Sequence, residues 1–274
     1  ALVLAAFLLG YFSLRSMAAL QSLPRRAARW RESRRERAVH AAVFDALAHQ
    51  VAGRFVRARS AAREAIDQLE ATQVHAADRS PLHAQWQAMG HLLAAESAHH
   101  LRDQGLRNSQ LGLALAAASR AGDGSVLREG ALLRAVRWAV EDRDLAAASH
   151  WLAQLPQGAA RRTLALRLKL RVAQLAQDHT TALDTARLLA KHGAFSALAS
   201  RSLLRGLFMD GLRACHDADQ VRALWRRTDA RDRQDPDLAL AAAQRLLTMA
   251  DAHANGDAQA AGVLATGREW VVPL

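Results

Sequence analysis

The sequence predicts an all-α protein, a tetratricopeptide-like solenoid of helical hairpins preceded by a transmembrane helix. Three observations lead to this fold class. Alanine and leucine dominate the 274 residues, which include only 15 Gly and 5 Pro. Apolar residues recur every three or four positions from residue 38 onward, which is the period of an amphipathic helix. Two stretches also align with each other at an offset of 34 residues, the length of a tetratricopeptide repeat.

Residues 1–23 are expected to be the C-terminal part of a transmembrane helix. The stretch "ALVLAAFLLGYFSL" carries no charge over 14 residues. As a helix it spans about 21 Å, whereas the hydrocarbon core of a bilayer measures roughly 30 Å. Two interpretations follow: a buried helix, or a spanning helix whose outer end lies upstream. A signal peptide is disfavoured because the arginines follow the apolar run instead of preceding it.

Residues 24–37 form an Arg-rich juxtamembrane segment, and with Arg15 they supply a basic collar opposed only by Glu32 and Glu36. Arginines close to the end of a span mark its cytoplasmic side, and each contributes about 1 kcal/mol near anionic lipid. The alternatives are a solvated helix face and a nucleic-acid patch. Nucleic acid is disfavoured because the remaining charge is diffuse and no recognition fold is evident. The collar consists of Arg15, Arg25, Arg26, Arg29, Arg31, Arg34, Arg35 and Arg37.

Residues 38–195 are predicted to form tetratricopeptide-like hairpins. The offset of 34 aligns residues 132–156 with residues 166–190. It aligns Ala148 with Ala182, and each is expected where the two helices of its own hairpin cross closely. A hairpin nearer the N-terminus has Gly53 in its turn, Phe55 at the start of its second helix and Ala58 as the small crossing residue. The register drifts between Ala58 and Ala148, since their spacing is not a multiple of 34. Each hairpin is too apolar on one face to be stable alone, so neighbours are expected to stack.

Residues 196–274 are expected to be divergent helical repeats whose last unit is incomplete. The predicted helix breaks along the chain are short and contain Gly, Pro or Asp. They lie at residues 76–81, 120–124, 154–158, 191–195, 233–236 and 254–257.

No catalytic residue is predicted, because the sequence lacks the nucleophile, phosphate-loop and dinucleotide motifs that enzymes of these classes need. The 12 His include the adjacent His99 and His100, whose side chains would diverge on a helix, and no HExxH occurs. We therefore predict no metal site. The single Cys215 excludes an internal disulfide and a multi-Cys metal centre.

The order of an apolar stretch, the collar "LPRRAARWRESRRERA" and the hairpin "ALAHQVAGRFVRARSAAREA" resembles the HemY family of proteobacterial inner-membrane tetratricopeptide proteins. The resemblance is most specific over residues 10–70. It implies a repeat domain on the cytoplasmic side of the inner membrane and a non-catalytic role in late porphyrin or haem biosynthesis or haem homeostasis. Implied partners are haem-biosynthesis enzymes or other proteins in the repeat groove, and anionic inner-membrane lipid.

Two other functions remain open from the sequence. One is a tetratricopeptide adaptor for envelope assembly or regulation, although the lone Cys215 argues against the member of that group that carries a Cys-pair metal module. The other is a carrier that binds haem or porphyrin directly, for which no cofactor motif is present.

Overall fold

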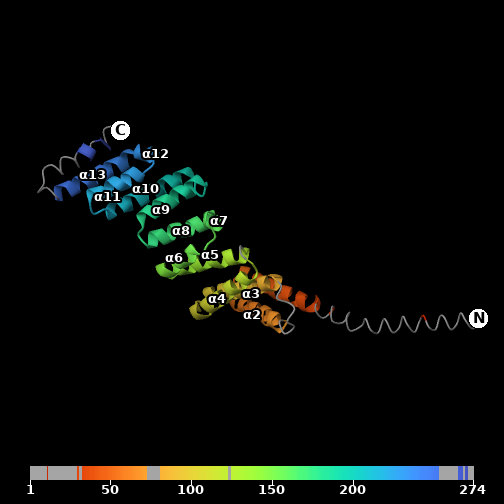
Figure 1. The fold of residues 1–274 in the computed structure, drawn as a ribbon. Helices are drawn as coiled ribbons and strands as arrows, with labels where there is room; N and C mark the ends of the chain where they lie inside the picture. Colours follow the sequence, from red (N-terminus) through yellow and green to blue (C-terminus); the bar gives the residue numbers. More distant parts are fainter. Residues whose placement is uncertain are drawn as a thin grey trace, which may run out of the picture. The chain divides into compact units, whose positions relative to one another are not determined.

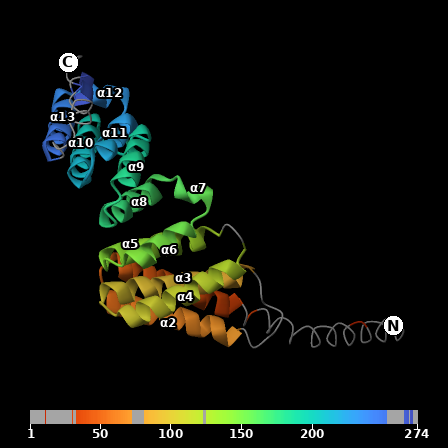
Figure 2. The ribbon, with the colours of Figure 1, turned by 60° about the vertical axis from the view of Figure 1, so that its left-hand side comes forward.

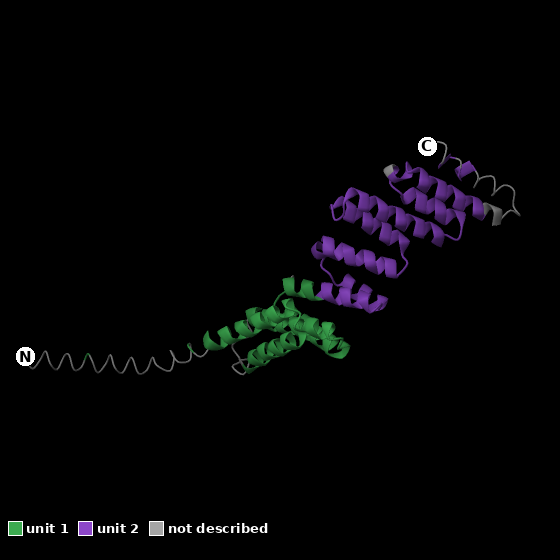
Figure 3. Ribbon diagram, turned by 180° about the vertical axis from the view of Figure 1, so that it is seen from behind, with its two compact units in different colours: residues 1–131 green, residues 132–274 purple. Residues whose placement is uncertain are grey.

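The computed structural model describes residues 33–72, 81–122, 125–252 and 265–267, together with Tyr11, Trp30, Glu269 and Trp270. All elements in these ranges are helices, and no strand occurs among them. The all-α prediction is therefore confirmed. The chain divides into two compact units, residues 1–131 and 132–274 (Figure 3). The boundary falls within one helix, α5 (Val126–Glu141).

Unit 1 is built from a helix over residues 33–51, α2 (Phe55–Thr72), α3 (Pro81–His100) and α4 (Gln104–Arg120). The first three share a core in which small side chains let the helices approach closely, with Ala46, Ala62 and Ala65 fully buried. α3 is the central helix, since it packs against both α2 and α4 (Figure 2). At Gly90 of α3, a Cβ would meet the Ile66 side chain at 3.0 Å, so a larger residue there would require the Ile66 side chain to shift.

Unit 2 contains the end of α5 and the remaining helices (Figure 1). The C-terminal half of α5 packs with α6 and α8 around Val136, Ala148 and Val172. A second, larger core joins α8, α9, α10, α11 and α13. The helices are α6 (Leu145–Ala153), α7 (Gln157–Ala160), α8 (Thr163–Leu175), α9 (His179–Lys191), α10 (Ala197–Ala214), α11 (Ala218–Arg227), α12 (Ala230–Arg233) and α13 (Pro236–Ala252).

One turn recurs between successive helices. A residue with a positive φ ends the first helix, and the next residue's amide donates to a carbonyl five residues back, as in a Schellman motif. At three of these turns that next residue is an aspartate whose carboxylate also caps the following helix: Asp103 for α4, Asp144 for α6 and Asp178 for α9. The turns are therefore tight, and consecutive helices run antiparallel. The positive-φ residues of these recurrent turns are Gly53, Arg102, Arg143, Gln177 and Gly193.

The predicted breaks agree with several helix ends in the described ranges: α4 ends at Arg120, α9 at Lys191, and α13 begins at Pro236. No helix in those ranges combines the length and the apolar character needed to cross a bilayer. The span predicted over residues 1–23 lies outside the described residues, apart from Tyr11. The tetratricopeptide assignment of the hairpins stays a prediction.

The Asp178 cap makes stability depend on pH. Its carboxylate accepts from the Thr181 amide at 2.9 Å and from the Thr180 hydroxyl at 2.7 Å. Hydrogen bonds from Thr181 and Thr180 lower the pKa of Asp178 from 3.8 to about 2. A carboxyl with a lowered folded-state pKa stabilises the fold above its unfolded pKa, and loses that contribution as the pH falls from about 4 toward 2.

We expect Asp178→Ala to lose about 1 kcal/mol of unfolding free energy at pH 6, since the cap is exposed and screened. The difference from the unmodified chain should shrink below pH 4. Asp178→Asn keeps a capping oxygen without a titrating group, so it should retain most of the stability at pH 6. Urea denaturation of the three chains between pH 2.5 and 7 measures this; an equal Asp178→Ala deficit at every pH would contradict the linkage.

Candidate functional site

The basic collar is only partly within the described residues. Arg34, Arg35 and Arg37 are exposed on the helix over residues 33–51. The guanidinium of Arg34 lies 5.3 Å from the ring centroid of Trp30, and Arg37 donates to the Ser33 carbonyl at 3.0 Å. The other predicted members, Arg15, Arg25, Arg26, Arg29 and Arg31, lie outside the described residues.

The alanines predicted to pack the repeats are buried in the structure. Ala58, Ala148 and Ala182 are each at most 1% exposed. Each stands four residues after the last residue of the recurrent turn. Gly53 occupies the positive-φ position of its turn, and α2 begins at Phe55, whose ring stacks on His100 at 4.1 Å.

The second hairpin has a different residue at the crossing position. The residue four after Asp103 is Arg107, which is 6% exposed. Its guanidinium donates to Asn108 and lies 3.5 Å from the His99 ring. Nearby, His91 is buried and its Nδ1 lies 2.8 Å from Gln110 Oε1. These contacts give hydrogen-bond partners to the polar side chains that are buried between α3 and α4.

No three His, Cys, Asp or Glu side chains in the described part of the chain gather closely enough to hold a metal ion. Cys215 follows α10; its thiol is buried and donates to the Gly211 carbonyl at 3.2 Å. Burial raises the pKa of Cys215, against the opposing charge of Arg245.

A raised thiol pKa and burial both reduce the exposed thiolate, which is the reactive species. We expect Cys215 in the folded chain to react with a disulfide reagent at pH 8 roughly tenfold or more slowly than a cysteine introduced at the exposed Ala48. Both thiols should react alike in urea. Equal rates in the folded chain would show that Cys215 is accessible.

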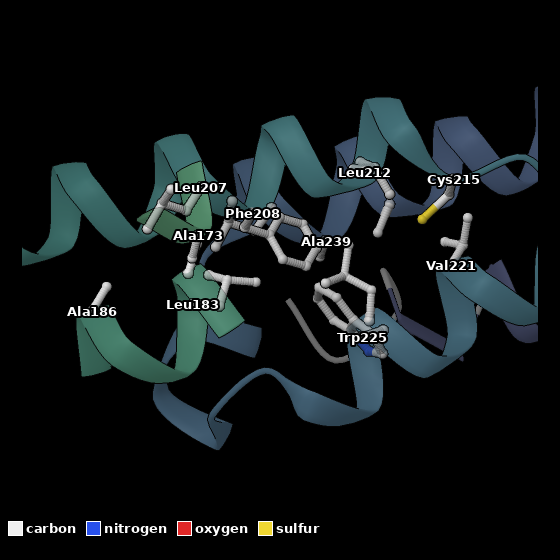
Figure 4. Close-up of a cluster of buried hydrophobic side chains, with 14 of the residues drawn as sticks. Ala173, Leu183, Ala186, Leu207, Phe208, Leu212, Cys215, Val221, Trp225 and Ala239 are labelled. Carbon is white, nitrogen blue, oxygen red and sulfur yellow. The ribbon is translucent and has the colours of Figure 1, made fainter. Parts of the chain in front are cut away.

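Three arginines border a pocket on the α9 and α10 side of unit 2, here called the arginine pocket. Its volume is about 260 Å³. The apolar residues Leu183, Phe208 and Leu238 form part of its lining. All three belong to the large core, in which Figure 4 shows Leu183 and Phe208. The lining residues are Leu183 and Arg187 of α9, Arg201, Leu204, Arg205 and Phe208 of α10, Thr228, Asp232 of α12, Gln234, Asp235 and Leu238 of α13.

The arginines of the pocket differ in their partners. Arg187 pairs with Asp184 at 3.2 Å and with Asp229 at 3.7 Å. Arg205 donates to Asp237 at 2.6 Å. Arg201 is exposed and has no hydrogen bond or ion pair to any described residue, so it is available to an incoming anion.

Asp232 of α12 also lines the arginine pocket. Burial raises its pKa, and the nearby Asp229 adds to this, while Arg187 opposes it. A carboxyl with a raised pKa binds a proton, and so loses its negative charge, more readily than an ordinary aspartate does. Asp235 also lines the pocket, and of the three arginines only Arg201 has no described partner, so Arg201 is where an incoming carboxylate would find an unpaired positive charge.

A second, more open concavity is lined in part by α11 and is here called the tryptophan groove, with a volume of about 780 Å³. The rings of Trp225 and Trp270 stack in it with centroids 5.0 Å apart. Its lining residues are Asp219, Arg222, Trp225, Arg226, Ala230, Arg233, Gln234, Thr266, Glu269 and Trp270.

Neither concavity was predicted from the sequence. Trp225, which lines the tryptophan groove, is 5% exposed. Arg201 and Arg205 are surface arginines at i and i+4 with no local motif. They become part of a pocket because α10 lies beside α12 and α13 in the folded chain. The spacing of residues along the sequence does not predict that packing.

Comparison with known proteins adds one match. Residues 1–85 match the family model described as HemY protein N-terminus. No curated protein and no solved structure matches the chain. The match covers the apolar stretch, the collar, the first hairpin and the start of α3. The predicted resemblance to the HemY family is therefore confirmed, and it is carried by residues 1–85.

Proposed function

We propose that the protein is a non-catalytic, membrane-tethered scaffold that acts in late porphyrin or haem biosynthesis, or in haem homeostasis, by binding other proteins. The observation that carries this proposal is the match of residues 1–85 to the HemY N-terminus, a family linked to haem biosynthesis. The tether is the apolar stretch and its arginine collar, with the hairpins on the cytoplasmic side of a bacterial inner membrane. Tethering raises the local concentration of bound partners without any new contact.

The size and the lining of the arginine pocket suit a protein ligand better than a small molecule. Small-molecule sites usually enclose about 300–1,000 Å³, and this pocket measures about 260 Å³. That volume suits one or two side chains better than a whole macrocycle. Leu183, Leu204 and Phe208 supply apolar contact, and Arg201 supplies a positive charge. An acidic and apolar segment of a partner protein fits this chemistry.

Capture from membranes tests the proposal. The tagged full chain is cross-linked in cells, solubilised in mild detergent, and its partners are identified by mass spectrometry. Enrichment of porphyrin-pathway enzymes over a tagged, unrelated membrane protein is the expected result. Their complete absence, with other envelope proteins enriched instead, would favour the envelope adaptor.

A direct porphyrin carrier is a second candidate, and the tryptophan groove is the observation that favours it. Its volume of about 780 Å³ lies in the range of small-molecule sites. Trp270, stacked on the buried Trp225, offers an aromatic surface, and Arg226 and Arg233 offer partners for carboxylates. Titration of the purified chain with protoporphyrin should quench its tryptophan fluorescence less when Trp270 is replaced by alanine. No saturable quenching would dismiss the carrier.

A further inference from the structure

The helix over residues 33–51 has two apolar faces, although a helix at the end of a stack needs only one. Val39, Val43 and Ala46 lie on the buried face and are at most 7% exposed. On the other side, Phe44 is 69% exposed, Leu47 48% and Val51 83%. Their spacing of three and four residues places them in one stripe, here called the outer stripe.

The outer stripe is unusual within the described part of the chain. Each of the helices from α2 to α13 exposes at most two large apolar side chains, and none of those is aromatic. Single exposed apolar residues are ordinary on protein surfaces, whereas an apolar patch marks a surface that meets another apolar medium. The outer stripe is therefore a candidate contact surface for an apolar occupant.

Charge around the outer stripe identifies the chemistry of that occupant. Residues 25–59 contain ten arginines and only three acidic residues. Arg34 and Arg37 are exposed on the same helix, and Trp30, 58% exposed, lies under the Arg34 guanidinium. An apolar stripe bordered by arginine and tryptophan is the pattern of a helix that lies in the headgroup layer of an anionic bilayer.

We propose that the helix over residues 33–51 lies flat in the surface of an anionic membrane. Phe44, Leu47 and Val51 reach the acyl chains, and Arg34 and Arg37 bind lipid phosphates. The first hairpin then serves both as part of unit 1 and as a membrane contact. This inference rests on the tether proposed above, because an uncharged stretch over residues 1–14 precedes this helix in the same chain.

A fluorescent reporter at residue 48 tests the placement directly. Ala48 is exposed on the same helix, next to the outer stripe, and Ser60 is exposed on α2. In a Cys215→Ser background, Ala48→Cys or Ser60→Cys of the full chain is labelled with a nitrobenzoxadiazole dye. Each labelled chain is then reconstituted into phosphatidylglycerol–phosphatidylcholine vesicles that contain nitroxide lipid.

The dye at residue 48 should be blue-shifted and quenched by nitroxide lipid, and the dye at residue 60 should show neither effect. Phe44→Ser, or Arg34→Glu with Arg37→Glu, should reduce quenching at residue 48 to the level at residue 60. In pure phosphatidylcholine vesicles the quenching at residue 48 should also be weaker, because the arginines are attracted to a surface that carries net negative charge.

The outcomes separate this inference from the scaffold role. A chain held in the vesicles with residue 48 still accessible to aqueous iodide would overturn the inference and leave the tether intact. A chain that stays off the vesicles would overturn both the tether and the inference. Protection of residue 48 without nitroxide quenching, together with cross-linking between copies, would assign the outer stripe to a second copy and overturn the membrane contact. The capture experiment reports on the scaffold role independently.

Discussion

Phe208→Ala is expected to destabilise unit 2 by about 3–5 kcal/mol. The ring of Phe208 is 2% exposed and belongs to the core that joins α8, α9, α10, α11 and α13. It packs edge-on to Trp225, with centroids 6.0 Å apart (Figure 4). Removing it leaves a cavity that the surrounding helices fill only in part. Because small domains have about 5–15 kcal/mol of stability in total, a large share of unit 2 chains should unfold at moderate temperature.

Phe44→Ala is the matched control, since it removes the same side chain from an exposed position. In solution it should change stability by no more than about 0.5 kcal/mol. Hydrogen exchange followed residue by residue separates the two units, and the Phe208→Ala loss should appear in α9, α10 and α11. Equal protection of α10 in both variants would show that the core tolerates the cavity by repacking.

The hairpins were predictable because their causes are local. Helical periodicity and the breaks at Gly, Pro and Asp depend on residues close in sequence. Asp144 and Asp178 pair at the offset of 34, and both cap a helix in the structure. The same capping chemistry at Asp103 went unrecognised because α3 and α4 are longer than their counterparts, which moves the turn off the period.

Two features of the structure could not be predicted from the sequence. Arg102, Arg143 and Gln177 adopt positive φ without glycine, because the surrounding hydrogen bonds of the turn fix the backbone there. Sequence rules look for glycine at such positions. The arginine pocket joins residues from α9 to α13, so it depends on tertiary packing that no spacing between Arg187, Arg201 and Asp232 reveals.

Arg201→Glu is expected to reduce the capture of acidic partner proteins roughly tenfold or more, since placing like charges together at an interface costs several kcal/mol. Arg201 lacks a described partner, so its replacement breaks no ion pair of the folded chain. Its neighbour Arg205 is already neutralised by Asp237. Arg201 therefore provides the one positive charge of the pocket that no described residue pairs with, and the loss should be visible in the quantity of each protein recovered from membranes.

Arg171→Glu supplies the matched control. Arg171 is exposed on α8, it makes the same change in net charge, and it does not line the arginine pocket. Both variants should keep the circular dichroism of the unmodified chain, and only Arg201→Glu should lose its partners. If the two variants lose capture equally, the attraction is a property of the net charge of the whole chain and the pocket has no specific role. If neither loses it, partner binding lies on another face of the hairpins.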